Sequence, residues 1–273
     1  GAGKVSVSIG AAADVFTVSG ATYTSDEGSG ATLTFDAGTA KYTYTSADGT
    51  VAIFDQALGA KFRGVAYLGI MTILTSPAGE ITNFNYKTVT FGGVSSTRLQ
   101  SLTNNFGYQL HLDFASNNVA SSGDFPNWEK RTKVTGVNNA VDYCAPAADT
   151  CSGFTVTWPY ANYAGGWSLE TSVTDALGRT TNYGYSGAYI ATIKWPGSAS
   201  ANLTFTYNWQ GRVASVNRGF GTWTYGYVDA GGNRTTTVTA PGGGQRVAIS
   251  NLATGLISSM RDELLRTTSF LYF

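Results

Sequence analysis

The stretch D-A-L-G-R-T-T-N-Y-G-Y, from Asp175 to Tyr185, decides the fold, because it recurs as D-E-L-L-R-T-T-S-F-L-Y from Asp262 to Tyr272. Both copies carry an aspartate, a leucine, an arginine, two threonines and a final aromatic-x-tyrosine. Self-similarity at a fixed spacing is typical of repeat architectures. In these two copies and in weaker ones, a turn residue precedes large apolar residues five and seven positions later: Gly79 with Phe84 and Tyr86, Gly107 with Leu112 and Phe114, Gly178 with Tyr183 and Tyr185, and Leu265 with Phe270 and Tyr272.

This spacing has a structural meaning, because residues five and seven positions after a turn lie on the same face of a strand. We therefore expect each unit to be a hairpin that buries an aromatic pair on one face. An arginine just after the turn is expected to bond exposed carbonyls or a nearby aspartate. The residues expected to form the repeat are Asp175, Gly178, Arg179, Tyr183, Tyr185, Tyr207, Gly211, Arg212, Tyr225, Tyr227, Asp262, Arg266, Phe270 and Tyr272.

Alternation of apolar and polar residues runs through most of the chain, which favours strands with one buried face. The longest stripe joins Tyr108, Leu110, Leu112 and Phe114, and a shorter one runs over 154–158. The chain also holds 34 glycines and 36 aromatic residues (16 Tyr, 14 Phe and 6 Trp), which favours many short strands joined by tight turns. The sequence predicts an all-β fold of repeated antiparallel hairpins.

The charge balance excludes some classes of partner. The 17 basic and 17 acidic side chains cancel, so no basic patch for nucleic acid is expected. No apolar run of about 18 residues is present, so membrane insertion is not expected.

The two cysteines, Cys144 and Cys151, lie in the turn-rich segment C-A-P-A-A-D-T-C. Their spacing is too wide for a CxxC redox or zinc motif, and no further Cys or His pair completes a metal site. We expect a local disulfide, with two free thiols as the alternative. A disulfide would indicate an oxidising compartment.

No group of residues predicts catalysis, and we expect neither an enzyme nor a cofactor. The single histidine, His111, is expected on the polar face with Gln109 and Asp113, opposite the apolar stripe. The glutamates lie mostly in turn-like contexts: Glu27, Glu80, Glu129, Glu170 and Glu263. The tryptophans are expected to pack against the sheet, although exposed ones could stack on sugar rings: Trp128, Trp158, Trp167, Trp195, Trp209 and Trp223.

The Asp, the Gly-Arg turn and the closing Tyr-x-Tyr of 175–185 resemble the RHS/YD-repeat family, and 42–55, 76–86, 98–110 and 137–144 resemble the lead-in of its bacterial members. The resemblance covers about residues 30–273. It implies a curved sheet that forms part of a hollow β-shell, with an N-terminal lead-in (1–135), a Cys-containing loop (136–153) and YD/RHS repeats (154–273). Family shells hold more repeats and a plug, and Phe273 falls inside an expected strand, so we expect a chain truncated at its C-terminus.

The resemblance further implies a scaffold of a secreted or surface-exposed bacterial protein that encloses a C-terminal toxin or effector, or mediates surface contact. Its expected partners are further repeats and cargo of its own polypeptide, and a glycan or cell-surface receptor. The alternatives are a carbohydrate-binding adhesin or extracellular fibre component, and an enzyme that acts on polysaccharide. An open strip exposes edge strands and an apolar face, so self-association is also expected.

Overall fold

The computed structural model describes residues 3–10, 12–26, 28–59, 68–157, 160–165 and 169–272, and this part of the chain is almost all β, with 56% strand and 5% helix. The predicted all-β class is confirmed. The chain divides into two compact units, Gly1–Ser168 and Leu169–Phe273. None of the helices in the described ranges is long and apolar enough to cross a membrane.

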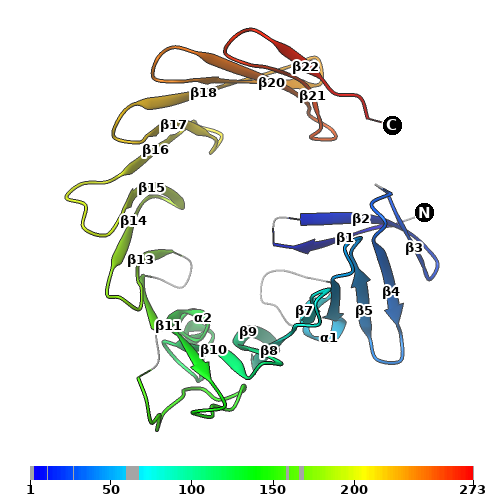
Figure 1. Ribbon diagram of the computed structural model, residues 1–273, viewed down its shortest axis with the longest axis vertical. Helices are drawn as coiled ribbons and strands as arrows, with labels where there is room; N and C mark the ends of the chain where they lie inside the picture. The colour runs from blue at the N-terminus through cyan, green and yellow to red at the C-terminus, as the bar shows by residue number, and fades with distance from the viewer. Residues whose placement is uncertain are drawn as a thin grey trace. The chain divides into compact units, whose positions relative to one another are not determined.

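The first unit begins with a small antiparallel sheet of β1 (Gly3–Ile9), β2 (Ala12–Ser19) and β3 (Thr22–Ser25). This sheet lies beside β4 (Thr32–Asp36), β5 (Lys41–Thr45) and β6 (Val51–Asp55) (Figure 1). Phe16 of β2 is fully buried there, and its ring meets the edge of the Tyr44 ring at 6.3 Å between centroids. Leu33 and Ala52 complete this apolar core, which joins the small sheet to the longer one.

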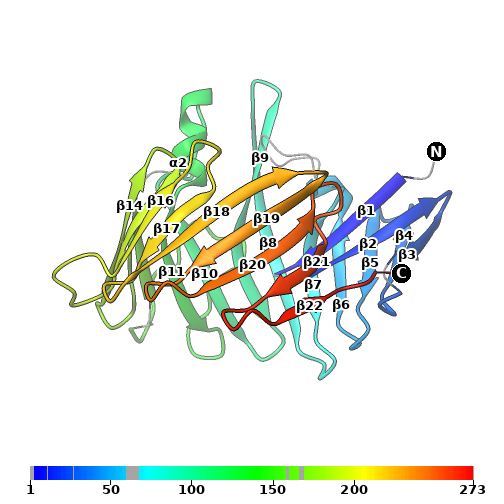
Figure 2. The same cartoon turned by 90° about the horizontal axis from the view of Figure 1, so that it is seen from above.

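The longer sheet of the first unit continues by pairing each strand with the next along the chain. Two of its strands, the paired β8 and β9, have 11 residues each, and they are the long strands of Figure 2. The remaining elements are α1 (Gln56–Gly59), β7 (Ile70–Thr75), β8 (Ile81–Phe91), β9 (Val94–Asn104), β10 (Tyr108–Phe114), η1 (Ser122–Asp124), α2 (Phe125–Glu129), β11 (Arg131–Asn138) and β12 (Tyr160–Gly165).

The second unit is an antiparallel meander, in which successive strands lie side by side (Figure 2). Most of the described side chains on these strands are half-buried or exposed. Val216 is the buried hydrophobic residue among those described in this unit. Its strands are β13 (Glu170–Thr174), β14 (Thr180–Ser186), β15 (Tyr189–Lys194), β16 (Leu203–Tyr207), β17 (Val213–Asn217), β18 (Thr222–Ala230), β19 (Asn233–Thr239), β20 (Gln245–Asn251), β21 (Ile257–Arg261) and β22 (Thr267–Ser269).

One strand predicted from alternation is not formed. Residues 151–157, which include Phe154 and Val156, have irregular backbone rather than strand, and Trp158 lies outside the described residues. Hydrogen bonds to a carboxylate explain part of this, because Asp142 accepts from the backbone N–H groups of Thr155 and Val156. A side chain that binds adjacent N–H groups competes with strand pairing.

Among the described residues, six turns of five residues share one pattern of backbone hydrogen bonds. The N–H of the first residue donates to the carbonyl of the fifth, and the N–H of the fourth donates to the carbonyl of the first. The fourth residue has a positive φ of 65–89° in every copy, which favours glycine. Five copies have glycine there, and the copy that begins at Asp262 has Leu265. The turns begin at Ser46, Ser76, Asp175, Asn208, Ala240 and Asp262.

Replacing Leu265 by glycine is expected to stabilise the protein by up to about 1 kcal/mol, because a leucine at φ 65° is strained. The side chain is 70% exposed, so little packing is lost. Denaturant unfolding measures the change. The neighbouring Leu264→Gly, at a position with 72% exposure and without a positive φ, is the control and should not stabilise. Equal effects of the two variants would contradict the strain argument.

Candidate functional site

The two closest repeat copies form the same turn, bond for bond. The Asp175 carboxylate accepts from the backbone N–H groups of Leu177 and Arg179 at 2.9 Å, and from the Arg179 Nε at 2.7 Å. The Asp262 carboxylate accepts from Leu264, Arg266 and the Arg266 Nε at the same three distances. An aspartate at the first position and an arginine at the fifth therefore clamp the turn from outside.

The hydrogen bonds of these clamps lower the pKa of both carboxylates. The hydrogen bond from the Arg179 side chain is the main cause that lowers the pKa of Asp175. The backbone N–H of Arg266 is the main cause that lowers the pKa of Asp262. Both aspartates are therefore ionised at neutral pH, which is the state that the turn hydrogen bonds require.

The looser copies keep parts of this arrangement. Asn208 accepts from the backbone N–H groups of Gln210 and Arg212, as the aspartates do, but an amide forms no ion pair with the arginine. Arg212 instead reaches Asp229, 3.4 Å away, which also binds Arg234 at 2.8 Å. We expected each repeat arginine to bond either an exposed carbonyl or a nearby aspartate. In each of these copies the arginine side chain binds an aspartate.

In five units the second aromatic is a tyrosine that binds a strand lying earlier in the chain. The Tyr185 hydroxyl donates to the carbonyl oxygen of Glu170 at 2.7 Å, and Tyr207 donates to Ile190 at 2.7 Å. The same bond, from hydroxyl to backbone carbonyl 14–17 residues back, recurs in three further places. These are Tyr86 to Met71, Tyr227 to Val213 and Tyr272 to Ile257. The closing tyrosine is therefore a cross-strand tie.

The aromatic pairs are not buried as predicted. Tyr183, Tyr185, Tyr225 and Tyr227 are half-buried, whereas Phe270 and Tyr272 are exposed. The physical reason is that these strands form an antiparallel meander whose described side chains, apart from Val216, stay half-buried or exposed on both faces.

Replacing Tyr86 by phenylalanine is expected to cost about 1 kcal/mol at neutral pH, because the bond to the Met71 carbonyl at 3.0 Å is lost. Burial raises the pKa of Tyr86 from 10.0 to about 12. The unfolded chain therefore ionises first, so this contribution is complete below pH 10 and is lost between about pH 10 and 12. Urea unfolding at pH 8 and pH 11 should show the gap between the two proteins narrowing at the higher pH. A constant gap would contradict the prediction.

Cys144 and Cys151 form a disulfide with 5.6 Å between their Cα atoms. Cys144 is buried and Cys151 is half-buried. The bridge closes a loop that packs on β9 and β10, since Ser101 donates to the Pro146 carbonyl at 2.8 Å.

Replacing both cysteines by alanine is expected to lower the free energy of unfolding by about 2–3 kcal/mol, by the loop entropy of so short a ring. Guanidinium unfolding measures the loss. Thr150→Ala, inside the same ring, is the control and should change stability little, because Thr150 is exposed. A loss no larger than that of the control would mean that the bridge does not restrict the unfolded chain.

The loop covers a polar face of β9 and β10, and here the predicted orientation of β10 is wrong over 108–111, although Leu112 of the apolar stripe is buried as expected. Gln109 and His111 are buried, with exposed fractions of 2% and 1%, whereas Tyr108 and Leu110 of the apolar stripe are exposed at 57% and 48%. Two of the buried polar side chains find partners on this face: the Gln109 Oε1 accepts from the Asn139 Nδ2 at 2.9 Å, and Gln100 donates to the Leu112 carbonyl at 2.7 Å. Polar groups can be buried where such partners exist.

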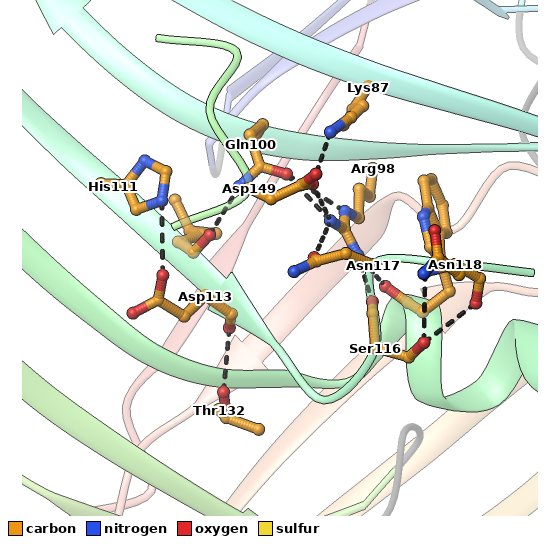
Figure 3. A network of polar contacts seen from close by, with 12 residues as sticks. Lys87, Arg98, Gln100, His111, Asp113, Ser116, Asn117, Asn118, Thr132 and Asp149 are labelled. Carbon is orange, nitrogen blue, oxygen red and sulfur yellow. Dashed lines mark hydrogen bonds and ion pairs between the residues drawn. The ribbon is translucent and has the colours of Figure 1, made fainter. Parts of the chain in front are cut away.

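Arg98 lies at the centre of this polar face (Figure 3). Its guanidinium donates to the carbonyl oxygens of Ser116 and Trp128 and to the side-chain oxygens of Gln100 and Asn117, at 2.6–3.2 Å. It also lies over the rings of Phe114 (3.9 Å) and Trp128 (4.4 Å). Arg98 thus holds residues 115–130 against the sheet. We did not predict this residue, and the polar run S-S-T-R-L-Q-S (95–101) was its only signal.

Burial lowers the pKa of Arg98 to about 10, because desolvation penalises the charged form, while the Asp149 carboxylate opposes that shift from 3.4 Å. Arg98 is therefore still charged at neutral pH. Asp149 also pairs with Lys87 on β8, so the disulfide loop is joined to the sheet by two cations. This network secures the loop against the sheet.

His111 lies between the disulfide and a carboxylate. Its Nδ1 is 3.9 Å from the Cys144 Sγ. Its Nε2 is 3.4 Å from the Asp113 Oδ1, as Figure 3 shows for these two residues. A base between a sulfur and a carboxylate resembles the order of a nucleophile, a base and an orienting acid. In the disulfide, however, Cys144 has no thiol to activate, and both Cys144 and His111 are buried.

The remaining candidates are scattered. Trp128 is fully buried, whereas Trp209 is 90% and Trp195 is 50% exposed. Glu129 accepts from Ser96 at 2.7 Å, and Glu263 pairs with Arg246 at 3.2 Å. Glu27, Trp158 and Trp167 lie outside the described residues.

Neither a comparison with protein families nor one with curated proteins gives a match.

Proposed function

We propose that this chain is a non-catalytic wall segment of the RHS/YD-repeat kind, from an exported bacterial protein that encloses a C-terminal toxin or effector or mediates surface contact. The observation that carries the proposal is the identity of the turns at Asp175 and Asp262, down to the same three hydrogen bonds on each carboxylate. A motif that repeats in sequence and in bonding favours a chain built by stacking one unit.

The chemistry of the unit supports a structural role. The Asp–Arg clamp closes a turn, and the tyrosine hydroxyl ties one strand to an earlier one. Each bond therefore joins near neighbours along the chain. Stability that comes from neighbouring units is the property that lets a repeat protein form an extended wall.

The first unit also has a surface suited to further polypeptide. A hollow of about 420 Å³ on β8–β11 is lined by Leu102, Tyr108 and Leu110, and the last two are exposed at 57% and 48%. Exposed apolar surface of this kind favours contact with another protein segment. We assign it to the rest of the same polypeptide, either further repeats or cargo. The Cys144–Cys151 disulfide is consistent with an extracellular location.

Peptide mapping and limited proteolysis of the natural protein test this proposal. We expect further turn-and-tyrosine units after residue 272, followed by an unrelated segment that resists protease until the repeat region is cut. The isolated C-terminal segment is the control and should be digested at the same protease concentration. A natural product without further units, or a C-terminal segment with equal protease sensitivity in both forms, would contradict an enclosing shell.

A carbohydrate-binding adhesin is the second candidate, favoured by the 90% exposure of Trp209 at the tip of a turn. An exposed indole can stack on a sugar ring. A glycan array with the wild type and with Trp209→Ala tests it, and Phe220→Ala, at an aromatic with 79% exposure on another loop, is the control. Binding lost only in the Trp209 variant would support the adhesin, and a flat array would dispose of it.

A further inference from the structure

The disulfide and His111 place three soft metal-binding atoms together. The Sγ atoms of Cys144 and Cys151 and a ring nitrogen of His111 all lie within 4.8 Å of one another. The disulfide joins the two sulfurs. Among the described residues, no fourth His, Cys, Asp or Glu belongs to this group of metal-binding atoms. A set of two thiolates and one imidazole is typical of zinc sites.

The orientation of the His111 ring favours a ligand role. Its Nε2 faces the Asp113 carboxylate at 3.4 Å, which favours a proton on that nitrogen and leaves the Nδ1 lone pair directed towards Cys144. A metal-binding histidine characteristically offers its other N–H to a carboxylate. A disulfide sulfur has no proton to donate, so in the oxidised protein the buried Nδ1 faces an atom that cannot satisfy it.

We propose that reduction of the Cys144–Cys151 disulfide converts this group into a Zn²⁺ site with Cys144, Cys151 and His111 as ligands and water at the fourth position. The disulfide and the zinc site are then mutually exclusive ways to close the same loop. The proposal does not depend on the role of the chain as a wall segment.

The geometry is close to that of a metal site. Zn–S bonds of about 2.3 Å and Zn–N bonds of about 2.0 Å in a tetrahedron separate S from N by about 3.5 Å and S from S by about 3.8 Å. The Cys144 Sγ is already 3.9 Å from the His111 Nδ1, so this pair needs little movement. The two sulfurs must separate, which reduction itself causes. Cys151 is half-buried, so its side chain has more room to move than that of Cys144.

The reaction balances with a dithiol as reductant. Thiol–disulfide exchange transfers two electrons and two protons from the dithiol to the protein, which gives two cysteine thiols and an oxidised dithiol. Binding of Zn²⁺ then releases both thiol protons, while His111 binds as the neutral imidazole. The sum is protein disulfide plus dithiol plus Zn²⁺, which gives the zinc dithiolate, the oxidised dithiol and two protons.

Metal titration of the full chain tests the site. The reduced, metal-free protein is titrated with Co²⁺, whose thiolate charge-transfer and ligand-field bands report tetrahedral sulfur ligands, and then with Zn²⁺, which should displace it at a ratio of one to one. The oxidised protein should bind neither ion. Binding by the oxidised form, or none by the reduced form, would overturn the proposal.

Variants separate the ligands from the loop. His111→Gln keeps both cysteines and should weaken Zn²⁺ binding by at least tenfold, and Asp113→Asn should weaken it about tenfold through the orientation of the ring. Thr150→Ala, inside the loop but exposed and outside the ligand group, should bind as the wild type does. Should His111→Gln fail to fold, X-ray absorption of the zinc-loaded wild type still decides, because two sulfurs and one imidazole are required. A zinc coordination sphere without imidazole, or a Zn²⁺ affinity that is unchanged in His111→Gln, would overturn the proposal.

Discussion

Replacing Arg98 by methionine is expected to lower the free energy of unfolding by about 3–5 kcal/mol. Methionine fills a similar volume but donates no hydrogen bond. The carbonyl oxygens of Ser116 and Trp128 and the amide oxygens of Gln100 and Asn117 would lose their shared donor inside the protein. Buried acceptors without donors cost about 1–3 kcal/mol each, partly offset by the desolvation of the charge that methionine avoids.

Two comparisons show whether the network causes this loss. Arg98→Lys keeps the charge but not the planar fork, so it should recover only part of the stability, because one ammonium cannot replace bonds from Nε and both terminal nitrogens. Arg246→Met, at an arginine with 69% side-chain exposure and one ion pair to Glu263, should cost less than about 1 kcal/mol. Guanidinium unfolding measures all three variants. Equal losses for Arg98→Met and Arg246→Met would contradict a structural role of the buried guanidinium.

Arg98 and His111 also show where sequence reasoning reached its limit. Alternation correctly separated Gln109 and His111 from Tyr108 and Leu110, because neighbouring side chains on a strand point to opposite faces. It could not decide which face is covered. Polarity suggested the wrong one, since the covering segments supply carbonyls and amides that bind polar groups. Those partners come from 116–128 and 139–149, whose sequence has no periodic signal.

The turns could be predicted, because their bonds are local. Asp175 and Arg179 are four residues apart, and the spacing alone brought them together. The tyrosine ties could not be predicted, because the partner of Tyr185 is the carbonyl of Glu170, on the strand before the turn, and its position depends on strand register. The sequence therefore identified the unit and its turn, and the structure added the bond that joins one unit to an earlier strand.

Replacing Gly221 by alanine is expected to lower the free energy of unfolding by about 3–5 kcal/mol, from two separate causes. Gly221 has a φ of +152°, a conformation almost restricted to glycine, whose occupation by alanine costs about 1–3 kcal/mol. A Cβ at this position would also lie 2.5 Å from the Cγ and 2.6 Å from the Cβ of Pro241. The proline ring is rigid, so the turn at 240–244 would have to move away from the loop at 218–221.

Gly219 provides a matched control in the same loop, because it also has a positive φ (+84°) but nothing lies within 4 Å of its added Cβ. Gly219→Ala should therefore cost only about 1–2 kcal/mol. Pro241→Gly removes both ring atoms that the new Cβ would meet, so in that background the cost of Gly221→Ala should fall to its backbone part. Urea unfolding of Gly221→Ala, of Pro241→Gly and of the variant that carries both measures the coupling energy between the two positions. Additive losses would show that the loop and the turn do not touch as described, and that backbone strain alone explains the glycine.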